Sequence, residues 1–258
     1  MSQETNNSGN TCKVILPSGK VVTLREQNGG DDETVSLMSN AVSGTNVSKF
    51  LAGLVLEDSE IGNNKPSYGD IEKWKLSDKY YAILKSRIHS IGDMVNFDFK
   101  CPQVGCKSKL TPYTEDLTLL DSDLSQPPPE KDYNPYKIKP YPYRSDTHRE
   151  FTLSSGKKVR YEYKTSKSEQ KLLEMDQNSI SKVTEFTVRN LEIFTGDKWV
   201  LVTAFSGFSA KDMKELRKDV SINDPQFEAI SEVTCAQCGT VHKIPLIAQR
   251  DFFFPGEI

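Results

Sequence analysis

Two close pairs of cysteines are the residues of this chain best suited to chemistry. Four residues separate Cys101 from Cys106, and two separate Cys235 from Cys238. In each pair a strand-like alternating run leads in and another leads out, which predicts a tight turn between two strands. Zinc prefers four tetrahedral nitrogen or sulfur ligands, and spacings of about two to four residues let both thiolates of one turn reach one ion. The sequence therefore predicts one structural Zn²⁺ held by Cys101, Cys106, Cys235 and Cys238.

Other interpretations of the four cysteines stay open at this point. Two separate or incomplete sites, or reduced thiols without metal, also fit, and His242 can serve the second turn instead. A redox role is disfavoured, because the redox Cys-x-x-Cys motif opens a helix, whereas a strand pattern follows Cys238. A site closed by four thiolates has no open position for water or substrate, so its metal would hold the two halves of the chain together.

The chain repeats itself at a nearly constant offset. Residues 16–22 (LPSGKVV) recur 137 residues later as residues 153–159 (LSSGKKV), and both copies have the pattern of a β-hairpin. The second marker is the pair Cys101 and Cys235, which lie 134 residues apart. Two markers in the same order predict an α+β fold that is internally duplicated. Each half is expected to be a β-hairpin plus helices, ending in a cysteine-bearing β-knuckle.

Hydrophobic periodicity places the elements that must position the cysteines. The expected helices are residues 32–39, 70–91, 168–176 and 211–220. Strands are expected at residues 94–99 and 227–233, each leading into its cysteines. Residues 47–56 and 180–194 fit either a helix or a strand.

Composition also divides the chain into parts. Residues 1–11 are polar and are expected to be disordered, residues 12–120 form the first half, and residues 150–258 form the second. Residues 121–149, rich in proline and tyrosine, are expected to be an extended linker. Aromatic side chains that can dock on a partner are found in this linker and near the C-terminus: Tyr141, Tyr143, Phe252, Phe253 and Phe254. The three phenylalanines can equally fold back on the chain's own core.

Several function classes are disfavoured by composition. The 258 residues are 36% apolar and 27% charged with a net charge of -3, so no global positive field attracts nucleic acid or anionic lipid. No apolar run approaches the roughly 20 residues of a membrane helix. The histidines are scattered and a Gly-rich phosphate loop is lacking, so neither an enzyme nor a small-molecule substrate is expected. Lys100, Lys107 and Lys109 leave a zinc-ribbon nucleic-acid-binding protein as an alternative, although acidic neighbours dilute their charge.

Longer stretches of the sequence resemble a known family. Residues 76–88 (LSDKYYAILKSRI), 95–102 (VNFDFKCP), 235–239 (CAQCG) and 252–255 (FFFP) are similar to baseplate hub proteins of contractile-tailed bacteriophages. The resemblance implies a structural component of the virion's tail baseplate that binds other baseplate and hub proteins and is assembled in the bacterial host cytoplasm. It implies no catalytic residues. Residues 21–26 (VVTLRE) also look like the start of some phage tail assembly chaperones, so a chaperone absent from the mature particle is the alternative.

Overall fold

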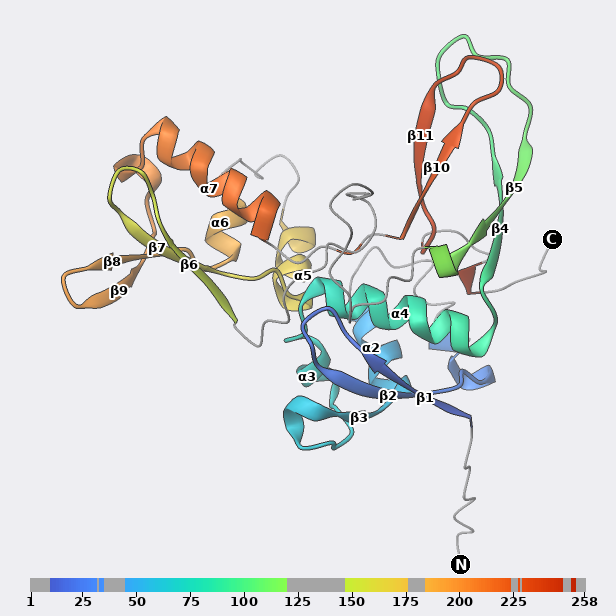
Figure 1. The fold of residues 1–258 in the computed structure, drawn as a ribbon, viewed down its shortest axis with the longest axis horizontal. Coiled ribbons are helices and arrows are strands. Elements are labelled where there is room, and N and C mark those ends of the chain that lie inside the picture. Colours follow the sequence, from blue (N-terminus) through green and yellow to red (C-terminus); the bar gives the residue numbers. More distant parts are fainter. Residues whose placement is uncertain are drawn as a thin grey trace, which may run out of the picture.

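The structure is a computed structural model that describes residues 10–31, 33–34, 45–119, 147–175, 184–223, 227, 229–247 and 252–253. It is a mixed α+β fold, as the sequence predicts (Figure 1). The first part of the chain contains β1 (Thr11–Ile15), β2 (Val21–Arg25), α2 (Thr45–Leu54), β3 (Val55–Asp58), η1 (Ser59–Ile61), α3 (Tyr68–Ile71), α4 (Leu76–Ser90), β4 (Met94–Phe99), β5 (Thr111–Asp116) and η2 (Leu117–Leu119). The second contains β6 (His148–Thr152), β7 (Lys158–Glu162), α5 (Ser166–Glu174), α6 (Thr184–Val188), β8 (Glu192–Thr195), β9 (Lys198–Leu201), η3 (Phe205–Gly207), α7 (Ala210–Asn223), β10 (Ile230–Thr234) and β11 (Val241–Pro245).

Two antiparallel sheets form the body of the molecule. The first has the strand order β1-β2-β3, and its apolar side chains, including Val14 and Leu24, share one core with helix α4. The second has the order β6-β7-β8-β9 and a core of its own, in which Val159 and Tyr161 pack with Leu216 of α7. In each case one face of a sheet is buried against a helix, which is how an antiparallel sheet shields its apolar face from water.

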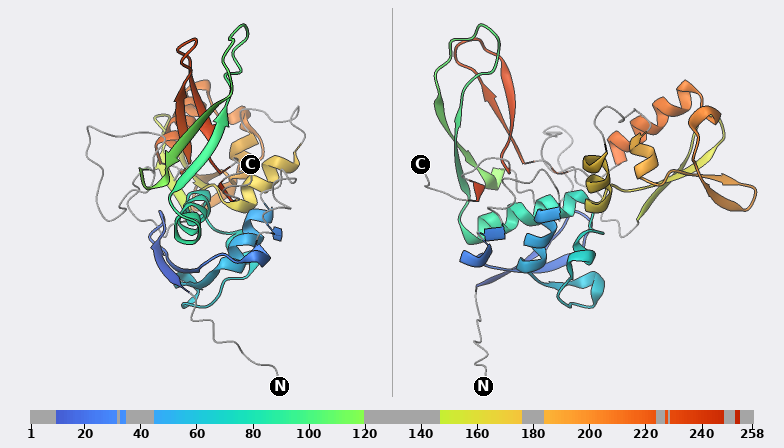
Figure 2. Two further views of the ribbon diagram at one scale, coloured as in Figure 1. Left: turned by 90° about the vertical axis from the view of Figure 1, so that its right-hand side faces the viewer. Right: turned by 180° about the vertical axis from the view of Figure 1, so that it is seen from behind.

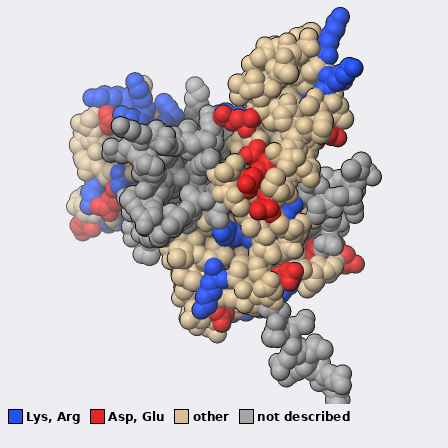
Figure 3. Space-filling view, turned by 45° about the vertical axis from the view of Figure 1, so that its right-hand side comes forward, with Lys and Arg blue, Asp and Glu red and all other residues tan. Residues whose placement is uncertain are grey.

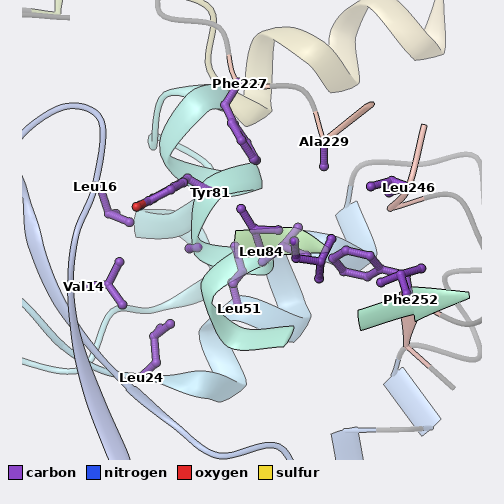
Figure 4. Packing of buried hydrophobic residues seen from close by; sticks show 14 of the residues in the cluster. Val14, Leu16, Leu24, Leu51, Tyr81, Leu84, Phe227, Ala229, Leu246 and Phe252 are labelled. Carbon is purple, nitrogen blue, oxygen red and sulfur yellow. The ribbon is translucent and has the colours of Figure 1, made fainter. Parts of the chain in front are cut away.

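The cysteine-bearing hairpins form a separate projection, here called the arm, which consists of β4–β5 and β10–β11 with their connecting turns. The two hairpins lie side by side and extend away from the body with their turns at the far end (Figures 1 and 2). The chain on either side of β10–β11 returns to the first core, where Phe227, Ala229, Leu246 and Phe252 join the buried residues of α4 (Figure 4). The first core is therefore built from both ends of the sequence.

Most of the expected elements are confirmed, and one is corrected. Strand β4 matches residues 94–99, α7 contains 211–220, and α5 covers most of 168–176. Residues 47–56, which fit either a helix or a strand by sequence, contain most of helix α2 and the start of strand β3. The prediction of a helix at 32–39 falls mostly outside the described residues. In the described part of the chain, no helix has both the length and the apolar character needed to span a membrane.

The predicted single helix at residues 70–91 is wrong, because α3 ends at Ile71 and α4 begins at Leu76. Backbone groups in the break pair with the second half of the chain. The N–H of Leu76 donates to the carbonyl of Lys164 at 3.0 Å, and the N–H of Ser166 donates to the carbonyl of Trp74 at 3.2 Å. These long-range bonds take up backbone groups at the end of α3 and the start of α4, and hydrophobic periodicity cannot reveal them.

A buried ion pair reinforces this junction between the halves. The Lys79 side chain is fully buried in α4, and its Nζ lies 3.3 Å from a carboxylate oxygen of Glu169 in α5. The hydroxyl of Tyr80 donates to the other oxygen of Glu169 at 2.7 Å. Burial lowers the pKa of Lys79, and the carboxylate of Glu169 opposes that shift. The carboxylate of Glu169 therefore favours the charged form of the ammonium inside the protein.

The two Ser-Gly-Lys turns have the same conformation. In each, the leucine that enters the turn donates its N–H to the carbonyl of the lysine, at 2.8 Å for Leu16 and 2.9 Å for Leu153. The turn glycines, Gly19 and Gly156, have φ angles of 89° and 85°. This left-handed region is open to glycine without a steric penalty, so both turns require glycine at that position.

Each Ser-Gly-Lys turn also contacts the first turn of a helix through an aspartate. Asp78 in α4 accepts from the backbone N–H of Ser18 at 2.8 Å, and Asp212 in α7 accepts from Nζ of Lys157 at 2.8 Å. These aspartates lie 134 residues apart, the same offset as Cys101 and Cys235. At that offset the buried residues of α7 correspond to buried residues of α4, namely Asp212, Met213, Leu216 and Val220 to Asp78, Lys79, Ala82 and Ser86. The duplication stays a prediction, and these shared contacts support it.

Replacing Glu169 with Gln removes the carboxylate nearest to the buried ammonium of Lys79. Loss of a buried pair is costly, and the partial exposure of Glu169 reduces that cost, so we expect the free energy of unfolding to fall by about 2 kcal/mol. Urea denaturation measures it. The control is Glu150→Gln, which breaks an exposed pair with Lys158 and should cost less than about 0.5 kcal/mol. Equal effects of the two substitutions would contradict a structural role for the junction.

Replacing Asp212 with Asn tests the contact between the second turn and α7. Hydrogen bonds lower the pKa of Asp212 in the folded protein, and the bond from Lys157 has the largest effect. Its stabilising contribution is therefore present above the unfolded pKa of about 3.9 and is lost as the pH falls through the lower folded value. The Tm difference between wild type and Asp212→Asn should be largest near neutral pH and shrink below about pH 4. Asp98→Asn, at an exposed site on β4, should show little difference at either pH.

Candidate metal centre

The first cysteine turn follows β4 at the far end of the arm. Cys101 is the second residue after the buried Phe99, so the alternation of the strand points its side chain toward the second hairpin. Its N–H donates to Oγ of Ser108 at 3.0 Å, and the N–H of Cys106 donates to the carbonyl of Gln103 at 3.0 Å. These bonds bring both sulfurs of the turn to one side.

The second cysteine turn is tighter. The N–H of Gly239 donates to the carbonyl of Cys235 at 2.8 Å, and the N–H of Cys235 donates to the carbonyl of Thr240 at 2.9 Å. Gly239 has a φ of 72°, which a residue with a side chain rarely adopts. The glycine therefore lets the chain reverse directly after Cys238 while both thiols face the first turn.

The structure brings the four predicted cysteines together. Their sulfur atoms all lie within 4.8 Å of one another, and the pairs Cys101–Cys238 and Cys106–Cys235 are both 3.7 Å apart. All four are free thiols, since a disulfide needs sulfurs about 2.05 Å apart. Sulfurs placed tetrahedrally about 2.3 Å from one zinc ion would be about 3.8 Å apart. The observed separations fit that arrangement, so the cluster can bind a metal ion.

Electrostatics make a cation the natural complement of this cluster. Burial raises the pKa of the Cys101 thiol to about 12. Hydrogen bonding from Thr240 lowers the pKa of the more exposed Cys238 to about 6. Several thiolates cannot share so small a space without positive charge, and a bound divalent cation supplies it and deprotonates its thiol ligands.

His242 lies beside the cluster, on strand β11. Its Nε2 is 3.2 Å from the sulfur of Cys101, and its ring packs against Phe99 with centroids 5.1 Å apart. It therefore contacts the first cysteine turn, whereas its position in the sequence suggested a ligand for the second cysteine turn. In the tautomer that carries its hydrogen on Nε2, the ring donates to the sulfur of Cys101, the kind of outer contact that orients metal ligands.

Thr240 is a further neighbour that spacing did not reveal. Its hydroxyl oxygen is 3.3 Å from the Cys238 sulfur. A threonine two residues after a cysteine carries no recognisable signal in a sequence. The role is visible only because the turn folds the hydroxyl back toward the sulfur.

The aromatic residues considered for partner binding have different positions. Phe252 is completely buried in the first core, and Phe253 packs edge-on against Phe50 with ring centroids 5.8 Å apart. The structure thus shows these two rings folded back on the chain's own core, the alternative that the sequence left open. Tyr141, Tyr143 and Phe254 lie outside the described residues.

The fold and the cysteine cluster define a class of protein, a mixed α+β scaffold in which four cysteines that can bind a metal join two distant hairpins. Comparison with protein families is consistent with a scaffold. The family model of the T4 bacteriophage base plate protein matches residues 10–254, so the chain belongs to this family of phage baseplate proteins. Searches of curated proteins and of solved structures gave no significant match. The predicted relationship to phage baseplate proteins is confirmed, and the hub location stays a prediction.

Replacing Cys235 with Ser should abolish stable metal binding by the cluster. Wild-type protein purified without chelator should contain about one equivalent of metal per chain, and the variant well under half of that, because one of four ligands is lost. Elemental analysis makes the measurement. The matched control is Cys12→Ser, since Cys12 is a half-buried cysteine of β1 outside the cluster. Metal-free wild type, or an equal loss in the Cys12 variant, would contradict the site.

Proposed function

We propose that this chain is a structural component of the hub region of a contractile-tailed phage baseplate, stabilised by a structural zinc ion. It acts through contacts with other baseplate and hub proteins, and it needs no catalytic residue. The observation that carries the proposal is the cluster of four thiols at the end of the arm, made from two hairpins more than 100 residues apart in a member of a baseplate family.

Zinc is the metal that the ligand set supports best. Four cysteine sulfurs in a tetrahedral arrangement favour zinc or an iron–sulfur cluster over magnesium or calcium. Sulfur separations of 3.7 Å fit a single ion. Closed by four protein ligands, such an ion has no position for water or substrate, so its contribution is to stability and shape. We propose Cys101, Cys106, Cys235 and Cys238 as its ligands.

A mechanical role suits the way the chain is put together. A metal bound by both hairpins closes a loop that contains the whole of the second sheet, since residues 106 and 235 flank it in sequence. Linking distant segments in this way stabilises a fold by restricting its unfolded state. The division into an N-terminal segment, two halves and a linker at residues 121–149 remains part of the proposal, although β6 already begins at His148.

The buried charged residues have structural partners that support a non-enzymatic protein. Lys20 forms ion pairs with Asp58 and Glu60 and lies over the ring of Trp74, within the first half of the chain. Lys79 and Glu169 join α4 to α5. In the described part of the chain these groups link elements of the fold, a role that differs from that of catalytic pairs arranged around a cavity.

Mass spectrometry of purified, infectious particles tests where the protein acts. As a baseplate component the chain should be present in the mature virion at a fixed ratio to other tail proteins, because such subunits bury large surfaces against their neighbours. A tail assembly chaperone would instead be found on assembling tails and be missing from virions. Detection in neither preparation, while the protein is abundant in infected cells, would refute both roles.

A further inference from the structure

The turn between Cys101 and Cys106 presents an apolar side chain at the far end of the arm. Val104 is 95% exposed, the highest value for a large hydrophobic residue in the described part of the chain. Leu110 and Val241, which flank the two turns, are 62% and 55% exposed. A single exposed apolar residue is ordinary, but here three lie in or beside the two turns of one projecting end, and a partner that covers them removes apolar area from water.

Metal binding does not explain the length of this turn. The second turn brings Cys235 and Cys238 to the cluster with two intervening residues, whereas the first uses four. The additional length includes Val104 and Gly105 at the apex. Gly105 has a φ of 82°, and a Cβ added at this glycine would meet no other atom within 4 Å. The apex therefore extends into solvent without packing on the rest of the protein.

The ionisable side chains of residues 99–111, other than the cysteines, are all lysines. Residues 99–111 contain the exposed lysines Lys100, Lys107 and Lys109 and no Asp or Glu, whereas Lys243 of β11 lies opposite Glu232 of β10 and is left out of this group. Figure 3 shows blue side chains at the far end of the arm, with red ones only farther down. Four thiolates around a divalent cation carry a net charge of about -2, which offsets part of the lysine charge but leaves the end positive. The lysines therefore exceed what the cluster needs for neutrality.

The surface is also held in a defined shape. The hydrogen bonds of the two turns and the convergence of four sulfurs order the residues next to Val104 before any partner binds. A pre-organised contact loses little conformational entropy on binding, which raises affinity for a given area. A few anchors that enter a pocket on the partner often contribute most of an interface's binding energy.

We infer that the end of the arm is a docking knob, formed by Val104 and Leu110 with Lys107 and Lys109, for an apolar pocket rimmed by carboxylates on another tail protein. The inference rests on the proposed function and adds the surface and the chemistry of its partner. Nucleic acid fits less well. Single strands need aromatic platforms for stacking, and phosphates would be met by the lysines without an apolar apex between them.

The test uses a phage strain that lacks the gene, complemented with the full-length chain. One variant deletes Val104 and Gly105, which gives the first turn the two-residue spacing of the second. The others are Val104→Ser and Val104→Asp. Ile222→Asp is the matched control, because Ile222 is a 55% exposed apolar residue on α7, away from the arm. The readouts are metal per purified chain, plaque-forming titre, and the amount of the chain on isolated tails.

The knob variants are expected to keep their full metal content, since no cysteine changes. We expect Val104→Asp and the deletion to reduce both titre and tail association by roughly tenfold or more, Val104→Ser to have a smaller effect, and the control to stay within about twofold of wild type. Metal-loaded Val104→Asp that complements as well as wild type would overturn the inference. If the deletion variant loses its metal, the inference is judged from Val104→Ser and Val104→Asp alone.

Two further outcomes would also overturn it. One is salt-dependent binding of mixed-sequence DNA by the wild type that Val104→Asp abolishes, and the other is self-association in sedimentation that depends on Val104. The proposed function fails separately, if the wild-type chain neither restores plaques nor associates with tails. If it does both and Val104→Asp does so equally, only the docking knob is refuted.

Discussion

The packing of the β4–β5 hairpin against the β10–β11 hairpin is the interaction on which the rest of the structure depends. An isolated two-stranded hairpin is at best marginally stable in water. Here the buried residues of β4 alternate through Val95, Phe97 and Phe99, and Val233 of β10 belongs to the same core. Each hairpin therefore provides the apolar surface that the other must cover. Their association places the cysteines together and determines where the chain must return.

This constraint shapes the remainder of the fold. The second hairpin packs on the first. The chain between them, which forms the second sheet and its helices, must therefore leave the region of α4 and return to it. This part of the chain is attached where it starts, through backbone bonds between residues 72–76 and 164–167 and through Lys79 and Glu169. It is attached again where it ends, through Phe227 and Ala229 in the first core (Figure 4). Two attachments hold the second sheet in a defined position more firmly than one can.

The division of roles follows from these contacts. The body contains buried ion pairs such as Lys20–Asp58 and Lys79–Glu169, and the arm holds the thiol cluster away from the body (Figure 2). A metal at the end of an arm contributes most to the rigidity of that end, because little apolar core is available there. A baseplate protein that must hold a fixed position among neighbouring subunits benefits from such rigidity, since contacts that are already ordered bind with less loss of entropy.

The sequence by itself determined the features that depend on neighbouring residues. The Ser-Gly-Lys turns, strand β4, helix α7 and the cysteine pairs were all predictable, because turn chemistry, side-chain alternation and ligand spacing act over a few positions. The nearly constant offset between the two sets of markers suggested that the two cysteine turns are equivalent, without requiring them to meet. Whether the wide first turn could reach the second was beyond these signals.

Only the tertiary structure decided the features that join distant segments. The break between α3 and α4 follows from backbone bonds to residues 164 and 166, and the burial of Phe252 follows from the return of the chain to α4. The contact of His242 with Cys101 links positions 141 residues apart. A local pattern carries no record of such partners. The free energy of these contacts depends on how the whole chain packs, and therefore becomes visible only in the folded protein.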